Sequence, residues 1–427
     1  MTLRSVSPAS LSGSLRAPPS KSYTHRGLIS GFLSQRSYRV DHPLEADDTR
    51  ATATGLELLG SVIRRSSSHW SLTPVTPTLH PNQTIRLRCG QSGTTLRFLT
   101  AVAARQGRLV RVEGDPRLAR RPLRPLLRVL RSGGVRIRRI GAPANLPLEI
   151  LGPLRGVRTS LHVGESSQFL SALLFVLPTL ETSSSLQLVG TPVSQEYVAA
   201  TLRVLSLHRV RVSLTPSVLE VEGGQQYRGA GFRVPGDASS AAYWWAAAGL
   251  NGGPIRVRGV PLDWPQADLE ILPILEAMGS HVARHSDGAT VEGRIREPFD
   301  VDLTNAPDLY PLVGSLAAQL PGTSVIRGAP HVVAKESDRR AATIRLVRGL
   351  GGTARLTRRG LEVRGTHSPR PLRSSLSDDH RVVMASAIAA TAASGPSLVG
   401  SAEAVRKSYP TFWDDLRSLG GTTKVAR

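Results

Sequence analysis

Cysteine is almost absent from the sequence, with Cys89 as the one instance among 427 residues. A single cysteine excludes an internal disulfide and a cysteine-rich metal site. The spacings typical of zinc sites, P-loops and dinucleotide-binding motifs are also missing. We therefore expect no metal and no cofactor. The lack of disulfides suits a reducing compartment, and we expect a cytoplasmic protein.

Long apolar runs are missing as well. The longest, Tyr243–Leu250 and Met384–Ala393, are much shorter than the ~20 residues that a helix needs to cross a membrane. The N-terminus has no basic segment followed by a long apolar core, so we expect neither a membrane span nor a secretory leader. Hydrophobic residues make up 40% of the chain, as in soluble globular proteins, and the length predicts two domains.

Aromatic residues make up only 4% of the sequence, although the net charge is +22. Such a charge is typical of nucleic-acid-binding proteins, so a basic RNA-binding repeat protein is one interpretation. However, the arginines are scattered, and no basic block is interleaved with the aromatic residues on which single strands stack. We expect instead an arginine-rich surface with a cationic pocket for small acidic substrates, and no nucleic-acid partner.

Lysine is nearly absent too. The four lysines of the chain are Lys21, Lys335, Lys407 and Lys424. An ammonium group is compact and can transfer a proton, whereas a guanidinium stays charged. A lysine that remains in an arginine-rich chain therefore marks a candidate site. The first three of these lysines lie in the motifs described below.

A weak repeat fills the whole chain. Apolar helices are predicted to open with a small polar or acidic residue about every 70 residues, at Ser22, Ser92, Ser166, Ser239, Asp308 and Asp379. A second helix follows in each unit and ends at a glycine, which adopts the left-handed conformation easily. In the third unit His208 takes the place of this glycine. Two short strands follow, such as Val210–Ser213 and Leu219–Val221.

The predicted unit is therefore helix, strand, helix, strand, strand, and six units account for the chain. Two domains of three units would divide near Phe232–Gly236, and the segment Leu3–Leu15 would pack with the second domain. We expect an α/β protein in which residues 18–234 form one domain and residues 1–17 plus 235–427 the other. Six polar helix N-termini could converge on one cleft between the domains, where their dipoles favour a multiply anionic ligand.

Residues near the helix starts of the first half favour such a ligand. Lys21, Ser22 and Arg26 combine cations and a hydroxyl with the free N–H groups of a helix start. The stretch Gly90–Arg97 offers glycine and hydroxyls, and Ser166–Gln168 offers neutral donors. Each stretch alone is explained at least as well by a capped helix with solvated side chains. Their recurrence favours the anion site.

The second half carries groups suited to acid–base chemistry. The segment His331–Arg339 contains five charged or titratable side chains, and a helix is predicted to start near Ser337. Lys335 and Glu336 would then project from the preceding loop, where a carboxylate beside a lysine can be poised to donate or accept a proton. Solvated ion pairs are the alternative interpretation.

Taken in order, these motifs resemble the EPSP synthase (3-phosphoshikimate 1-carboxyvinyltransferase) family. The resemblance runs from Leu15 to Leu419, and Ser166-Ser167-Gln168 and the segment Lys335–Arg339 are its most specific parts. It implies a two-domain fold in which each domain has three βαβαββ units packed around buried helices. It also implies a monomer that transfers the enolpyruvyl group of phosphoenolpyruvate to the 5-hydroxyl of 3-phosphoshikimate. The reaction belongs to the shikimate pathway of aromatic amino-acid biosynthesis.

The resemblance also implies roles for individual residues. The expected 3-phosphoshikimate site comprises Lys21, Ser22, Arg26, Ser166, Ser167, Gln168, Ser194, Tyr197, Asp308, His331 and Lys335. The expected phosphoenolpyruvate site comprises Lys21, Gly93, Arg121, Gln168, Arg339, Arg381 and Lys407. Asp308 is expected to take the proton of the attacking hydroxyl, and Lys335 or Glu336 to protonate the methylene carbon, with Lys21 as a further catalytic residue.

A UDP-N-acetylglucosamine enolpyruvyl transferase is the alternative enzyme, because that family shares the fold. It uses a cysteine on a mobile loop. Cys89 lies directly before Gly90–Arg97 and matches that position poorly, while Ser166-Ser167-Gln168 favours a shikimate substrate.

Overall fold

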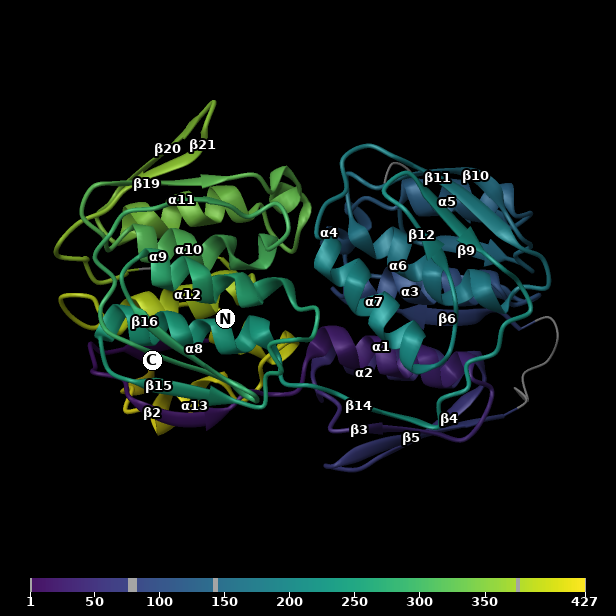
Figure 1. Ribbon diagram of the computed structural model, residues 1–427, viewed down its shortest axis with the longest axis horizontal. Helices are drawn as coiled ribbons and strands as arrows, with labels where there is room; N and C mark the ends of the chain where they lie inside the picture. Colours follow the sequence, from purple (N-terminus) through teal and green to yellow (C-terminus); the bar gives the residue numbers. More distant parts are fainter. Residues whose placement is uncertain (1, 76–82, 141–144, 374–376, 427) are drawn as a thin grey trace. The chain divides into compact units, whose positions relative to one another are not determined.

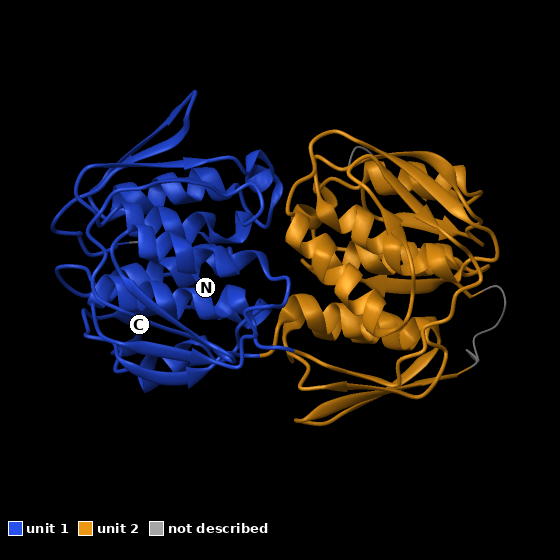
Figure 2. Ribbon diagram, viewed as in Figure 1, with its two compact units in different colours: residues 1–18, 235–427 blue, residues 19–234 orange. Residues whose placement is uncertain are grey.

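The computed structural model describes residues 2–75, 83–140, 145–373 and 377–426 (Figure 1). The chain forms two compact units, Met1–Pro18 with Pro235–Arg427 and Pro19–Val234 (Figure 2). It therefore leaves the first unit after the N-terminal strands and returns to it at Pro235. No helix in the described ranges is long and apolar enough to span a membrane.

The unit Pro19–Val234 contains three four-stranded sheets. The first sheet, ordered β14-β3-β5-β4, consists of β3 (Tyr38–Asp41), β4 (Ser61–Arg65), β5 (His69–Pro74) and β14 (Gly231–Arg233). The second, ordered β6-β7-β9-β8, consists of β6 (Ile85–Arg88), β7 (Leu109–Glu113), β8 (Arg136–Arg139) and β9 (Leu148–Leu151). The third, ordered β10-β11-β13-β12, consists of β10 (Arg158–His162), β11 (Ser184–Val189), β12 (Ser213–Leu214) and β13 (Val218–Val221).

The helices of this unit are interspersed among the strands along the chain. They are α1 (Lys21–Leu33), α2 (Asp47–Gly60), α3 (Gly93–Ala104), α4 (Pro116–Ala119), α5 (Arg124–Ser132), α6 (Ser167–Val176), η1 (Leu177–Thr179) and α7 (Gln195–Leu207). α1, α3 and α6 are buried along most of their length. Small residues make this possible. A Cβ at Gly31 would lie 2.5 Å from the Tyr38 ring, so glycine lets α1 pack closely on β3.

The other unit also contains three sheets. One, ordered β16-β17-β15-β2, consists of β2 (Gly13–Arg16), β15 (Ile255–Arg258), β16 (His281–His285) and β17 (Gly288–Glu292). The next, ordered β18-β19-β21-β20, consists of β18 (Asp300–Asp302), β19 (Thr323–Arg327), β20 (Thr353–Thr357) and β21 (Gly360–Arg364). The last has three strands in the order β22-β1-β23, namely β1 (Leu3–Val6), β22 (Ser397–Val399) and β23 (Thr423–Ala426).

Its helices are α8 (Ala238–Asn251), η2 (Ala267–Glu270), α9 (Ile271–Ala277), η3 (Pro307–Leu309), α10 (Tyr310–Ala317), η4 (Pro330–Ala334), α11 (Arg339–Gly349), α12 (His380–Ala390), η5 (Ala402–Lys407) and α13 (Phe412–Ser418). α8, α10 and α12 are buried almost completely, and they contact one another. They form the core of this unit.

The four-stranded sheets share one topology. In each, one edge strand pairs in parallel with its neighbour and the other two pairs are antiparallel. Two of the parallel partners come from distant sequence, since β14 pairs with β3 and β2 pairs with β15. Each four-stranded sheet and its helices therefore complete the predicted βαβαββ unit. The segment expected as one strand, Leu3–Leu15, forms β1 and β2, both in the unit with Pro235–Arg427.

Some helix starts agree with the prediction, and others differ from it by one or two residues. Ser92, Ser166 and Asp379 are N-caps whose side chains accept backbone N–H groups. α8 is capped by Asp237 rather than Ser239, because the Asp237 carboxylate accepts from both the N–H and the hydroxyl of Ser240. α1 begins at Lys21 after Ser20, which makes no side-chain capping bond.

The end of the third unit also differs from the prediction. The left-handed residue after α7 is Arg209, with a φ of 58°, whereas His208 has a φ of −96°. His208 is buried instead, with Nε2 2.6 Å from the Tyr38 hydroxyl. The predicted strand Val210–Ser213 shrinks to β12, because the Gln225 amide pairs with the backbone of Arg211 through two 2.8 Å bonds.

Candidate active site

The start of α1 places Lys21 beside an acidic residue of α2. The Nζ of Lys21 donates to Oδ2 of Asp48 at 3.0 Å. The side chains are 17% and 6% exposed, respectively. Asp48 was not predicted as a site residue. The only signal in the sequence is the pair Asp47-Asp48, which reads equally well as an acidic first turn of a helix.

Arg26 joins α1 to α7. Its Nη1 donates to the carbonyl and the hydroxyl of Ser22 at 3.0 and 2.7 Å. Its Nη2 donates to the Tyr197 carbonyl at 2.6 Å, and its Nε donates to Thr201 Oγ1 at 3.0 Å. Burial lowers the pKa of Arg26 to about 10, so the guanidinium stays charged at neutral pH. The structure therefore brings together Ser22, Arg26 and Tyr197.

A second group of predicted residues gathers at the start of α3. Arg97 donates from Nη1 to Gln168 Oε1 at 2.6 Å, and Gln168 donates to Thr94 Oγ1 at 3.0 Å. A Cβ at Gly93 would lie 2.7 Å from Nη1 of both Arg121 and Arg97. Only glycine leaves both guanidiniums where they are. Arg97 was noted in the sequence motif but not among the site residues, and it holds Gln168 in place.

A hydroxyl network connects the N-terminal halves of α1, α2 and α3. His25 Nδ1 lies 2.8 Å from Thr52 Oγ1, and Thr52 Oγ1 lies 2.8 Å from Thr95 Oγ1. Thr95 also bonds the hydroxyl of Ser92, the N-cap of α3, at 2.7 Å, and the Asp48 carbonyl at 3.1 Å. Burial lowers the pKa of His25 to about 3, so the ring is neutral. The network fixes the helix ends that carry Lys21, Asp48 and Gly93.

Three further predicted residues lie at the starts of α6 and α7. Ser166 caps α6 by accepting from the N–H of Gln168 at 3.3 Å. Ser167 is buried next to it. Ser194 is the N-cap of α7, is buried, and has a left-handed backbone with a φ of 54°.

In the unit with Pro235–Arg427, Arg339 is the centre of a charge network. The side chain is 1% exposed, and each nitrogen contacts a carboxylate. Its Nε donates to Asp379 Oδ2 at 3.0 Å, Nη1 to Asp308 Oδ1 at 2.5 Å, and Nη2 to Glu336 Oε2 at 2.9 Å. Burial alone would lower the pKa of Arg339, but the three carboxylates raise it well above its usual value.

Asp308 is surrounded by cations. Besides Arg339, it contacts Nη2 of Arg381 at 3.2 Å and Nζ of Lys335 at 3.6 Å. Burial alone would raise the pKa of Asp308, but these three charges hold it well below its usual value. In this arrangement Asp308 is an ionised carboxylate with weak affinity for a proton. Glu336 joins the same network, since Lys407 Nζ lies 3.5 Å from its Oε1.

The predicted loop before α11 is present, with a small shift. α11 starts at Arg339 rather than near Ser337, because Asp338 is its N-cap and accepts from the N–H of Ala341 at 3.0 Å. Ser337 donates to Asp379 Oδ2 instead, at 3.0 Å. Lys335 and Glu336 precede the helix as expected. Burial, with the nearby charge of Lys335, lowers the pKa of His331 to about 4.

Two buried acids of this unit were missed as site residues. Asp379 caps α12 and contacts Arg339, but in the sequence it reads as an ordinary N-cap beside Arg381. Asp268 of η2 is 1% exposed, and burial raises its pKa to about 6, opposed by the charge of Arg381. Nothing in the local sequence marks it. Within the described ranges, no group of three or more His, Cys, Asp or Glu side chains is arranged to hold a metal ion.

Solved enolpyruvyl transferases have the same fold as this chain. The structure of EPSP synthase from Acinetobacter baumannii matches with a TM-score of 0.80 and 23% identity, and the match covers 100% of each chain. The enolpyruvyl transferase NikO from Streptomyces tendae matches with a TM-score of 0.79 and 17% identity, over 100% of this chain and 99% of NikO. The fold is the two-domain fold of enolpyruvyl transferases.

Sequence comparison identifies the family. The family model described as EPSP synthase (3-phosphoshikimate 1-carboxyvinyltransferase) matches residues 6–416. The 3-phosphoshikimate 1-carboxyvinyltransferase of Methanoculleus marisnigri is 36% identical over 410 residues, which is 95% of this chain and 96% of that protein. The one from Halobacterium salinarum is 37% identical over 430 residues, 98% of this chain and 99% of that protein. The chain belongs to the EPSP synthase family, which confirms the resemblance and favours it over the UDP-N-acetylglucosamine alternative.

Proposed function

We propose that this protein transfers the enolpyruvyl group of phosphoenolpyruvate to the 5-hydroxyl of 3-phosphoshikimate, releasing phosphate. The observation that carries the proposal is the charge network of Asp308, Lys335, Glu336, Arg339 and Arg381 in a chain of this family. It combines cations for an anionic substrate with carboxylates for proton transfer. Residues of both units would take part.

The cations and the glycine suit phosphoenolpyruvate, which carries a carboxylate and a phosphate. Guanidinium groups bind both with paired, charge-assisted hydrogen bonds. We assign phosphoenolpyruvate to Lys21, Gly93, Arg121, Gln168, Arg339, Arg381 and Lys407. The absence of a side chain at Gly93 supports this, because it lets the Arg121 guanidinium lie directly against the backbone.

The hydroxyls and amides of the unit Pro19–Val234 suit a phosphorylated ring with several hydroxyl groups. We assign 3-phosphoshikimate to Lys21, Ser22, Arg26, Ser166, Ser167, Gln168, Ser194 and Tyr197, with Asp308, His331 and Lys335 from the other unit. The hydrogen bonds of Arg26 to Ser22 and Tyr197 support this assignment, because they fix α1 against α7 and hold these three residues together.

The reaction needs a proton donor and a proton acceptor. Lys335 or Glu336 would protonate the methylene carbon, and Asp308 would take the proton of the 5-hydroxyl as its oxygen attacks the cationic carbon. The tetrahedral intermediate then loses phosphate and one methyl proton, which restores the enol double bond. Asp308 is a weak base while Arg339 and Arg381 contact it. We infer that phosphoenolpyruvate, when bound, draws these two guanidiniums away from Asp308 and so raises the pKa of the Asp308 carboxyl.

A phosphate-release assay with both substrates tests the proposal. Wild-type protein should release phosphate only when both are present, and UDP-N-acetylglucosamine should not replace 3-phosphoshikimate. Lys21→Ala and Asp308→Ala should each lose turnover by at least ~10²-fold. Lys424→Ala and Asp263→Ala, which change exposed residues outside both clusters, should behave as wild type. No release by wild-type protein would exclude the proposed activity.

We further propose a cytoplasmic monomer without a nucleic-acid partner. The binding of small anionic substrates explains the positive charge of the protein without a nucleic-acid partner. Light scattering coupled to size exclusion should give the mass of one chain, 45.7 kDa, with and without both substrates. A mass of twice this value would contradict the monomer.

A further inference from the structure

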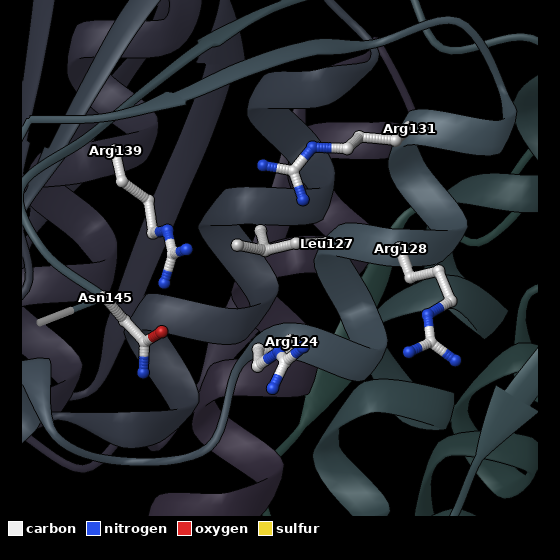
Figure 3. Close-up of a pocket in the computed structure, with 6 residues that line it drawn as sticks. All are labelled: Arg124, Leu127, Arg128, Arg131, Arg139 and Asn145. Atoms are coloured by element: carbon white, nitrogen blue, oxygen red, sulfur yellow. The ribbon is translucent and has the colours of Figure 1, made fainter. Parts of the chain in front are cut away.

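A pocket of about 220 Å³ lies in the unit Pro19–Val234, and none of the side chains that line it is assigned to the reaction (Figure 3). Its lining side chains are Arg124, Leu127, Arg128, Arg131, Arg139 and Asn145. Four of these six residues are arginines, and no carboxylate lines the pocket among the residues that the structure describes. The pocket is therefore strongly cationic.

The three arginines of α5 lie on one face of an amphipathic helix. Arg124, Arg128 and Arg131 are spaced by four and three residues, so they lie on successive turns and are exposed. Leu126 and Leu130 are buried on the opposite face. An exposed helical face of this kind usually alternates cations with acids. α5 has no acidic residue.

The arginines of the pocket have few partners in the described part of the chain. Arg131 donates to the Ile137 carbonyl at 3.2 Å, and no ion pair is found there for Arg124, Arg128 or Arg139. The adjacent Arg138 does form a pair, with Nη2 2.7 Å from Glu149 Oε2. Carboxylates are thus within reach of this strand, but the arginines that line the pocket do not use them.

Asn145 gives the pocket a fixed wall. Its side-chain amide donates to the Arg121 carbonyl at 2.8 Å, and its backbone N–H donates to the Ala119 carbonyl at 2.9 Å. Arg139, from β8, supplies the guanidinium that does not come from α5 (Figure 3). The cations therefore surround a hollow instead of forming a flat stripe.

We propose that this pocket is a second anion-binding site, which takes a small multiply charged phosphate ligand. Four like charges around one hollow repel each other, and an anion between them removes that repulsion. Guanidinium groups match the oxygens of phosphate in pairs. None of the described residues that line the pocket has an aromatic side chain on which a base could stack, which disfavours single-stranded nucleic acid.

Titration calorimetry with inorganic pyrophosphate on the full chain tests this site. Arg128→Gln/Arg131→Gln removes two of the four charges and should weaken binding about tenfold. Arg36→Gln/Arg64→Gln removes the same charge from exposed positions elsewhere in this unit and should leave the affinity unchanged. The proposed reaction site also binds phosphate groups. Lys21→Ala, which weakens that site, should therefore keep the pyrophosphate binding assigned to the pocket.

Each other outcome overturns the proposal. Equal affinity of the wild type and of Arg128→Gln/Arg131→Gln for pyrophosphate would show that the pocket does not bind it. Loss of pyrophosphate binding in Lys21→Ala would show that the ligand binds at the reaction site instead. Binding of a single-stranded RNA through Arg128 and Arg131, without pyrophosphate binding, would identify a nucleic-acid surface instead. Arg128 and Arg131 are exposed, so we expect Arg128→Gln/Arg131→Gln to release phosphate as the wild type does. Unchanged phosphate release would show that the double variant is folded.

Discussion

The Lys21 ammonium and the Asp48 carboxylate form an ion pair of 3.0 Å that joins the first turn of α1 to the first turn of α2. Both side chains are largely buried, so the pair restricts the direction of Lys21 more than a solvated pair would. Asp48 is not among the residues assigned to either substrate. We infer that it acts through Lys21 and is a positioning residue.

Replacing Asp48 by asparagine should therefore affect substrate binding more than turnover. Asp48→Asn keeps the shape but removes the charge that directs Lys21, and we expect KM for phosphoenolpyruvate to rise about tenfold with a smaller change in kcat. Steady-state kinetics measure both constants. Asp47→Asn, at the exposed neighbouring position, is the matched control and should change neither.

A double-mutant cycle separates positioning from a general effect on the fold. In Lys21→Ala/Asp48→Asn the second change should add little to the first, because the partner has already been removed. Additive losses would mean that Asp48 acts independently of Lys21.

Asp308 provides a prediction about chemistry. Asp308→Asn keeps a side chain of the same size in contact with Arg339 but cannot accept the proton of the hydroxyl. General-base catalysis contributes roughly 10²–10⁴-fold, so we expect kcat to fall by that factor. Single-turnover phosphate release, started by mixing with both substrates, measures the chemical step directly.

The control for this variant is Asp302→Asn, which changes an exposed acid of β18 in the same unit. It should retain wild-type kcat. If Asp308→Asn raised only KM and kept kcat, Asp308 would be a binding residue, and the base would have to be sought elsewhere.

Gly93 should not tolerate even a methyl group without loss of binding. A Cβ there would lie 2.7 Å from Nη1 of Arg121 and of Arg97, so Gly93→Ala must push both guanidiniums aside. We expect KM for phosphoenolpyruvate to rise at least ~10-fold, as expected when a charge-assisted contact is misplaced. Gly107→Ala is the matched control, because no atom lies within 4 Å of its Cβ position. Equal KM values for the two variants would remove Arg121 from the site.

The periodic features of the sequence predicted the fold well. The spacing of polar helix starts identified the buried helices, and Ser92 and Ser166 cap theirs as expected. These features are local, because a helix start depends on the few residues around it. The strands that complete a sheet from distant sequence, β14 and β2, follow instead from pairing with β3 and β15.

The residues that sequence reasoning missed depend on tertiary contacts. Asp48 and Asp379 look like ordinary residues of a first turn, and only the folded chain brings them to Lys21 and Arg339. His208 was expected in the left-handed position because it follows a helix, but its burial against Tyr38 moves that position to Arg209. None of these three contacts has a local signature.

His25 should make the stability of the protein depend on pH. Its ring is fully buried, and burial lowers its pKa to about 3 from an ordinary value of about 6.5. Below pH 6.5 the unfolded chain takes up a proton at this position that the folded chain cannot take up, so stability is lost as the pH falls. At pH 5 the cost relative to pH 8 is about 2 kcal/mol.

Denaturant unfolding at pH 8 and pH 5, followed by circular dichroism, measures this loss. His25→Gln keeps a polar group near Thr52 but cannot be protonated, so its free energy of unfolding should fall by about 2 kcal/mol less than that of the wild type. His208, whose pKa burial also lowers, is present in both proteins and cancels in the comparison. His42→Gln, at an exposed histidine of the same unit, controls for the loss of one imidazole. An identical pH dependence for wild type and His25→Gln would mean that His25 does not stay neutral inside the fold.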